Sequence, residues 1–410
     1  MTANAFPPPK MGEPYLLTPG PLTTAYEVKQ AMLKDWGSWD DDFRAMTRDM
    51  RRRLLALLGE GSEHYDCVPM QGSGSFCVEA MLGSFVPRDG KVLVLANGAY
   101  GLRAATTMDY LGRAKVLLDK GDYLPPRGDE VARILAEDPA ITHHERITTE
   151  VLAPYLNDDV ALVTLEVIQY RSGARTDLKS ITDQVRAIGA LVVWDASHAV
   201  GAIELNLDAN GVDLCVGCTY KYGNSGPGSP AWLYVSKRVQ SELQVPIQGW
   251  FAQDAQFEMG PVFERSQTIR GFQIASPSLM GIRCVQTAFS MIKEAGIDAI
   301  AHKAAVGTQM MIELYDAWLA PLGIELNTSR NAKERGGHIS LVHPDAAQIC
   351  VAMRTISNVI PDYRTPNSIR LAISPLPTSY VEIWDGFERM RDLVASGRYK
   401  EAVEGGSRVT

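Results

Sequence analysis

Short and nearly continuous apolar runs recur along the first part of the chain, separated by glycine-rich turns and by stretches with helical spacing. Runs of this kind are typical of strands that are buried on both faces of a parallel sheet. The predicted strands span residues 65–70, 91–96, 114–118, 160–167, 191–194 and 231–235. Apolar residues at helical spacing predict helices at residues 42–58, 76–85 and 278–294. This alternation predicts an α/β fold with a mostly parallel sheet.

The pattern changes after residue 297 and predicts a separate α+β unit. A helix at residues 298–318 precedes a strand at 338–342, a helix at 346–358 and a strand at 368–373. We therefore expect three parts. They are an N-terminal arm and helix at residues 1–44 that associates with the small domain, a large domain at 45–296 and a small domain at 297–410.

Composition narrows the function classes. The 410 residues carry a net charge of -8 without a basic block, so a nucleic-acid partner is not expected. No apolar run is long enough to span a membrane and the N-terminus lacks the apolar core of a signal peptide, so we expect a cytoplasmic protein. The six cysteines form no disulfide framework. Cys215 and Cys218 form a C-x-x-C without a second pair or clustered histidines, which favours packing over a metal site.

One lysine stands in an uncharged, aromatic and glycine-rich stretch, residues 217–228. An apolar run at residues 212–216, broken only by Asp213, leads into it. Lys221 is therefore expected to be partly desolvated, which favours the neutral amine. A neutral amine can attack a carbonyl carbon. Taken alone, Lys221 could equally be a surface lysine.

A second stretch, residues 191–198, has a buried-strand pattern that ends on a carboxylate, Asp195. Taken alone, Asp195 could cap the strand end. A lysine that forms a Schiff base, together with an acid that pairs with a pyridinium nitrogen, is the protein side of pyridoxal phosphate chemistry. The order Asp195 and then Lys221 therefore predicts pyridoxal 5'-phosphate as the cofactor.

A glycine-rich turn with Ser73, Gly74 and Ser75 follows the strand at residues 65–70 and opens a helix. Backbone N–H groups and hydroxyls at such a helix start suit a phosphate. A plain helix cap explains the same string, but its place ahead of Asp195 favours a phosphate site. Tyr100 follows the next strand, where it could stack on a planar ring or pack at a helix start.

With these motifs in hand, the chain resembles the fold-type-I pyridoxal phosphate enzymes of the class V aminotransferase group. Residues 11–142 are similar to 2-aminoethylphosphonate–pyruvate transaminase in the motifs at 17–21, 35–40, 70–75 and 97–101. Residues 146–410 are similar to kynureninase in the motifs at 170–173, 193–198, 217–222, 249–251, 334–337 and 367–370. The chain therefore resembles a fusion of two members of one group.

The resemblance implies the roles of the site residues. Lys221 would form the Schiff base and move protons, and Asp195 would keep the pyridine nitrogen protonated. Tyr220 and Trp250 would approach the cofactor phosphate, and His198 would lie near the cofactor. Lys221, Asp195 and Tyr220 are the candidate catalytic residues.

Further contacts are implied from both parts. Ser73, Gly74 and Ser75 would hold the phosphate and Tyr100 would stack on the ring. Ser276 stands where kynureninases often carry asparagine or threonine, which leaves a phosphate or substrate contact open. Arg370 would bind an amino acid carboxylate, which suits its planar guanidinium, although a surface ion pair would explain it as well. The group also implies a homodimer.

The resemblance leaves three functions open. The favoured one is a kynureninase-type hydrolase that cleaves L-kynurenine or 3-hydroxykynurenine to an anthranilate and L-alanine, because Lys221, Asp195 and Arg370 all lie in the kynureninase-like part. The alternative is transamination between 2-aminoethylphosphonate and pyruvate. The third is a cofactor-binding protein with little turnover, because each parent's substrate contacts are incomplete.

The transaminase-like part and the kynureninase-like part meet at a stretch that predicts two helices instead of one. Residues 129–136 and 148–155 both predict helices between two strands that need a single crossover. We expect the second helix to take the crossover position and residues 142–146 to form a flexible link.

Overall fold

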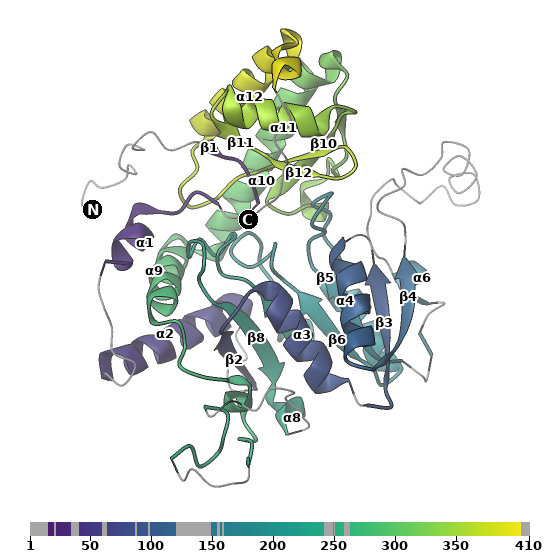
Figure 1. Cartoon of the computed structure of the whole chain (residues 1–410), viewed down its shortest axis with the longest axis vertical. Helices are drawn as coiled ribbons and strands as arrows, with labels where there is room; N and C mark the ends of the chain where they lie inside the picture. The colour runs from purple at the N-terminus through teal and green to yellow at the C-terminus, as the bar shows by residue number, and fades with distance from the viewer. Residues whose placement is uncertain are drawn as a thin grey trace.

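The structure is a computed structural model, and it describes residues 15–19, 22–33, 41–59, 64–86, 88–96, 99–119, 149–153, 156–157, 160–241, 249, 251–257 and 263–402. In this part of the chain a seven-stranded sheet forms the centre of a large α/β region. A smaller region with a four-stranded sheet, coloured green to yellow in Figure 1, lies beyond one end of the large sheet.

The large sheet is parallel except for one strand. Its order is β2-β8-β7-β6-β5-β3-β4, and only β8 runs against its neighbours. The strands are β2 (Tyr65–Met70), β3 (Lys91–Ala96), β4 (Ala114–Asp119), β5 (Val160–Glu166), β6 (Leu191–Asp195), β7 (Leu214–Gly217) and β8 (Ala231–Ser236). Because these strands are parallel, the residues that follow β2, β3, β5, β6 and β7 meet at one edge of the sheet.

Helices cover both faces of this sheet. One apolar core joins a face of the sheet to α3 (Gly74–Phe85) and α4 (Ala99–Tyr110). The core on the other face includes residues of α1, α2, α6, α7, α9 and α10. These helices are α1 (Tyr26–Ala31), α2 (Asp41–Leu58), α6 (Thr149–Leu152), α7 (Leu178–Ala187), α9 (Leu279–Ala295) and α10 (Ile297–Leu314). The remaining helices of the large region are α8 (Lys237–Gln240) and the short η2 (Ile269–Phe272).

The C-terminal region has its own core and its own antiparallel sheet, in the order β12-β13-β10-β9. Its strands are β9 (Glu325–Leu326), β10 (His338–Val342), β12 (Asp362–Arg364) and β13 (Ser368–Ala372). Its helices are α10, α11 (Ala346–Thr355), α12 (Tyr380–Ala395) and the short turns η3 (Tyr315–Leu319), η4 (Ala320–Leu322), η5 (Ala332–Glu334) and η6 (Arg398–Glu401). The strand β1 (Tyr15–Leu16) pairs with β11 (Val359–Ile360) beside this sheet.

The structure confirms the predicted α/β fold class with a smaller α+β part. The predicted strands match β2, β3, β4, β5, β6 and β8 within a few residues. The helices α4, α7 and α12 were not predicted. The first of the two doubled helices, residues 129–136, and the link at 142–146 lie outside the described residues, while the second is seen as the four residues of α6. No helix in the described part is long and apolar enough to cross a membrane.

Candidate active site

The carboxyl edge of the sheet brings three of the predicted motifs to one cavity of about 380 Å³. Asp195 ends β6, Lys221 follows β7, and residues 73–75 open α3 after β2. These motifs lie far apart in the sequence and meet because their strands are parallel. The lining residues are Ser73, Gly74, Ser75, Val78, Glu79, Gly101, Arg103, Ala104, Thr106, Thr107, Tyr110, Thr164, Leu165, Glu166, Gln169, Asp195, Ser197, His198, Tyr220 and Lys221.

Lys221 is half-buried in the wall of this cavity, and its Nζ lies 3.2 Å from Nε2 of His198. The loop that carries the lysine packs closely against the segment that follows β6. Gly201 has a φ of +81°, and a Cβ built there would lie 2.5 Å from the carbonyl oxygen of Tyr222. Only glycine fits this position. The tight packing therefore fixes where the lysine loop leaves the sheet.

His198 is buried and the protein environment keeps it neutral. Burial lowers the pKa of its imidazole well below the ordinary value, and the nearby charges of Lys221 and Arg370 add to this effect. A neutral imidazole has one nitrogen with a free lone pair. His198 can therefore accept a hydrogen bond from the amine of Lys221, or donate one to it, without a change in its own charge.

Asp195 stands at the end of β6 with its carboxylate facing the cavity. Its Oδ1 accepts a hydrogen bond from the backbone N–H of Ser197 at 2.7 Å, which fixes the side chain at the strand end. Tyr220 also lines the cavity. The structure thus brings together all three candidate catalytic residues, Lys221, Asp195 and Tyr220.

The start of α3 forms one wall of the cavity and has the character of an anion site. Oγ of Ser73 accepts a hydrogen bond from the N–H of Phe76 at 3.4 Å and so caps the helix. Gly74 packs closely, because a Cβ there would lie 3.2 Å from Oγ of Ser197. Arg103 on α4 donates a hydrogen bond to Oγ of Ser75 at 3.4 Å. A helix start beside a guanidinium suits a phosphate.

A group with the shape and chemistry of pyridoxal phosphate fits these residues. The anion site accommodates a phosphate, Asp195 can bind a protonated ring nitrogen and Lys221 can react with an aldehyde. In addition, Oε1 of Gln169 is buried in the cavity wall and has no hydrogen-bond partner among the described residues. A buried polar atom of this kind needs a partner, which a bound polar ring would supply.

Two predicted site residues do not line the cavity. Arg370 is 2% exposed, and its guanidinium donates hydrogen bonds to the carboxylate of Asp362 and to the carbonyl of Tyr170. Ser276 is exposed, and its carbonyl oxygen accepts a hydrogen bond from the side chain of Gln71. Tyr100 lies in the first turn of α4, but its side chain is outside the described part of the chain, and so is Trp250.

The cavity contains residues that the sequence did not single out. Gln169, Glu79 and Arg103 all line it, and none lies in a motif that composition alone would mark. The signal that could have found Gln169 is its place three residues after the end of β5, at the same edge of the sheet as Asp195. Arg103 lies one helical turn into α4, which begins just after β3.

Metal and thiol chemistry find no support in the described residues. They contain no group of three His, Cys, Asp or Glu side chains that could hold a metal ion. Cys215 and Cys218 are buried, and burial raises the pKa of both thiols above the ordinary value. These cysteines therefore pack as small apolar residues, as the sequence suggested.

Comparisons with known proteins each match a part of the chain. The model of the kynureninase C-terminal domain matches residues 300–390. A 2-aminoethylphosphonate–pyruvate transaminase of Rhizobium meliloti is 59% identical over 193 residues, which are 47% of this chain and 45% of that protein. A kynureninase of Geobacillus thermodenitrificans is 37% identical over 248 residues, which are 60% of this chain and 58% of that protein. The chain thus matches about half of the length of each relative.

Solved structures match nearly the whole chain. An alanine–glyoxylate aminotransferase from Nostoc sp. superposes with a TM-score of 0.72 at 17% identity, over 94% of this chain and 97% of that one. A cysteine desulfurase from Thermococcus onnurineus superposes with a TM-score of 0.73 at 14% identity, over 93% and 95%. At this identity the likeness shows a shared fold. The fold therefore extends across both of the sequence-similar parts.

Proposed function

We propose, from the premise that this chain belongs to the fold-type-I, class V aminotransferase-like group of pyridoxal phosphate proteins, that it is an aminotransferase. The observation that carries the choice of an aminotransferase is the 59% identity to a transaminase over 193 residues, and the cavity lined by Lys221, Asp195 and the start of α3 supports the cofactor chemistry that both candidate reactions share. These three features bind the aldehyde, the ring nitrogen and the phosphate of one cofactor.

The amino donor that we propose is 2-aminoethylphosphonate and the acceptor is pyruvate. Support comes from the relatives, since the transaminase match is 59% identical and the kynureninase match is 37% identical. The sequence motifs alone favoured the hydrolase because Lys221, Asp195 and Arg370 fall in the kynureninase-like part. The higher identity of the transaminase match reverses that order.

Kynureninase-type hydrolysis remains the second candidate. It is supported by the C-terminal domain match at residues 300–390, which includes Arg370. A guanidinium at this place could bind the carboxylate of an amino acid substrate. Because Arg370 forms an ion pair with Asp362 in this structure, the carboxylate of such a substrate would have to compete with Asp362.

Each residue of the candidate site has its own role in the proposed reaction. When bound, the cofactor supplies an electron-withdrawing ring that makes a proton on the substrate carbon acidic. The N–H groups that open α3, with Arg103, would hold the phosphate, and Asp195 would keep the ring nitrogen protonated. The amine of Lys221 would take the proton from the substrate carbon bonded to the nitrogen and deliver it to the carbon on the other side of that nitrogen. His198 keeps that amine in place between the two transfers.

A paired assay on the purified protein with pyridoxal phosphate tests this proposal. The phosphonate is followed by phosphorus NMR with and without pyruvate, and kynurenine is followed by anthranilate fluorescence. We expect pyruvate-dependent loss of 2-aminoethylphosphonate with formation of alanine, and no such loss in Lys221→Ala. Anthranilate formation without phosphonate loss would replace the proposal with the hydrolase. No turnover of either substrate would leave a cofactor-binding protein.

The proposal includes assembly as a homodimer, which follows from the resemblance to this group of proteins. Sedimentation equilibrium of the purified chain measures it directly. We expect a mass of twice 44.9 kDa. A monomer that turns over substrate would remove the dimer from the proposal and leave the chemistry intact.

A further inference from the structure

A histidine of the small domain reaches the lysine loop of the large region. His338 begins β10, is 0% exposed, and belongs to no motif that marked the candidate site. Its ring centroid lies 5.7 Å from that of His198, with the two planes tilted by 51°. His198 in turn contacts Nζ of Lys221 at 3.2 Å. The imidazole of His198 therefore contacts the lysine amine, and the imidazole of His338 packs beside that of His198.

The same histidine also holds the residue that follows the lysine. Oη of Tyr222 lies 3.4 Å from Nδ1 of His338, and both side chains are buried. The neighbouring Gly337 packs against this ring, since a Cβ there would lie 2.6 Å from a ring carbon of Tyr222. The start of β10 in the small domain therefore packs against Tyr222 of the lysine loop. Gly201 of the large region packs against the same residue.

Either group can be the donor in this contact. Burial raises the pKa of Tyr222 well above its ordinary value, so its hydroxyl keeps the proton and can donate it to Nδ1 or accept one from it. The contact orients the imidazole of His338 in both cases.

The surrounding charges keep both imidazoles neutral. Burial lowers the pKa of His338 well below the ordinary value, and Arg370 on β13 and Lys221 lower it further, while backbone groups of Tyr170 and Gln169 partly oppose them. Burial has the same effect on the pKa of His198, with Lys221, Arg370, His338 and Arg364 on β12 adding to it. Two imidazoles so close cannot both take a proton, because like charges disfavour the charged form.

We propose that His338 is a positioning residue of the proposed reaction, and that it fixes the ring of His198 and the loop of Tyr222 so that the amine of Lys221 is held over the cavity. This rests on Lys221 being the reacting amine of the proposed function. His338 does not line the cavity, and it acts through two neighbours. The small domain thereby contributes to the site without lining it.

The test compares His338→Phe with His338→Gln and with a matched control. Phenylalanine fills a similar volume without a nitrogen, whereas glutamine keeps an acceptor for Tyr222. His343→Phe makes the same change in the residue after β10, where its ring packs against Tyr399 at a centroid distance of 6.1 Å. All are made in the full chain, and the histidine ring signals are followed by NMR with carbon-13-labelled histidine in the cofactor-free protein.

In His338→Phe we expect the ring signals of His198 to move from their wild-type positions, because the ring that packs beside His198 has changed. In the loaded enzyme we expect kcat to fall about tenfold or more with KM unchanged, because an orienting contact and not a substrate contact is lost. His338→Gln should recover most of kcat, and His343→Phe should match the wild type in both measurements.

Unchanged ring signals of His198 in His338→Phe would overturn the proposal, and so would a kcat equal to that of His343→Phe. If the wild type turns over neither substrate, the proposed function fails, but the ring signals of His198 still decide the role of His338. The two failures are thus separable.

Discussion

Arg370 is almost fully buried and shares the carboxylate of Asp362 with a second arginine. Nη2 of Arg364 lies 3.0 Å from Oδ2 of Asp362, and the guanidinium of Arg370 contacts the same oxygen. Both guanidinium carbons also lie 5.9 Å from the ring centroid of Tyr170. One carboxylate thus balances two cations, of which Arg370 is buried and Arg364 is partly exposed. Both guanidinium groups lower the pKa of the nearby His198.

Replacing this carboxylate should destabilise the protein strongly. Asp362→Ala leaves a buried guanidinium without its counter-ion, which typically costs about 3 kcal/mol or more of unfolding free energy. Urea denaturation measures the change. Asp316→Ala is the matched control, because its ion pair with Arg330 is about half exposed and such a pair contributes about 1 kcal/mol or less. Equal effects of the two substitutions would contradict the assignment of Asp362 as a buried counter-ion.

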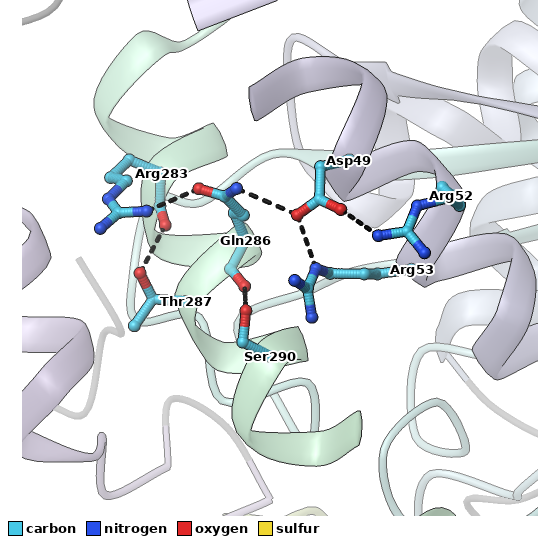
Figure 2. A network of polar contacts seen from close by, with 7 residues as sticks. All are labelled: Asp49, Arg52, Arg53, Arg283, Gln286, Thr287 and Ser290. Atoms are coloured by element: carbon cyan, nitrogen blue, oxygen red, sulfur yellow. Dashed lines mark hydrogen bonds and ion pairs between the residues drawn. The ribbon is translucent and has the colours of Figure 1, made fainter. Parts of the chain in front are cut away.

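At the scale of elements, a partly exposed polar network joins α2 to α9 (Figure 2). Asp49 accepts hydrogen bonds from Nε of Arg53 at 2.7 Å and from Nε2 of Gln286 at 3.0 Å, and it also contacts Arg52. Arg283 donates to Oε1 of Gln286 at 2.6 Å and orients its amide. Partial burial alone would raise the pKa of Asp49, but the bonds from Arg53, Gln286 and Arg52 hold it well below the ordinary value.

Asp49→Asn should therefore lower stability in a pH-dependent way. At neutral pH we expect a loss of about 1–2 kcal/mol of unfolding free energy, since hydrogen bonds to a charged group are lost. The folded-state pKa is depressed, so the stabilisation is fully present above the unfolded-state value of about 4 and decreases as the pH falls below it. Denaturation of both proteins over a range from about pH 3 to about pH 7, which includes that value, measures this difference.

The control for this experiment is Asp183→Asn, whose ion pair with Lys179 is more than half exposed on α7. It should change stability little at any pH. A difference between wild type and Asp49→Asn that stays constant down to the lowest pH would contradict the role of the ionised carboxylate.

At the scale of the whole molecule, one loop of the large region is bonded to the small domain along its length. The N–H of Gly336 donates to the carbonyl of Gly173 at 2.8 Å, and the N–H of Arg175 donates to the carbonyl of Glu334 at 2.8 Å. Oγ1 of Thr328 donates to the carbonyl of Ser172 at 2.6 Å. Together with the contact between His338 and Tyr222, these bonds couple the two cores.

We therefore expect both regions to unfold in one cooperative step. Calorimetry of the full chain should show a single transition, and pyridoxal phosphate should raise its midpoint, because a ligand of the folded state stabilises the whole unit. Thr328→Val should lower the midpoint without splitting the transition, since it removes a buried hydrogen bond worth about 1–3 kcal/mol. Two resolved transitions in the wild type would show that the small domain is not coupled to the site.

Local sequence determined the strands and the two central site residues. The apolar run at residues 231–235 became β8 within one residue of its predicted end, and all residues of β8 are buried, as expected for a strand covered on both faces. Asp195 and Lys221 were identifiable because each follows such a run and carries a charge where the run ends. The helix α12 was not predicted, although Ile383, Phe387 and Met390 have the spacing of the buried face of a helix.

Tertiary structure alone decided which side chains meet. The order of strands in the sheet places Gln169 and Arg103 beside Lys221, and no spacing in the sequence encodes that order. The partner of Arg370 is Asp362, eight residues away on the neighbouring antiparallel strand, which the pairing of β12 with β13 sets. His338 reaches His198 only because the small domain packs on the carboxyl edge of the large sheet. Periodicity reports how buried a position is, whereas neighbours distant in sequence depend on how the whole chain packs.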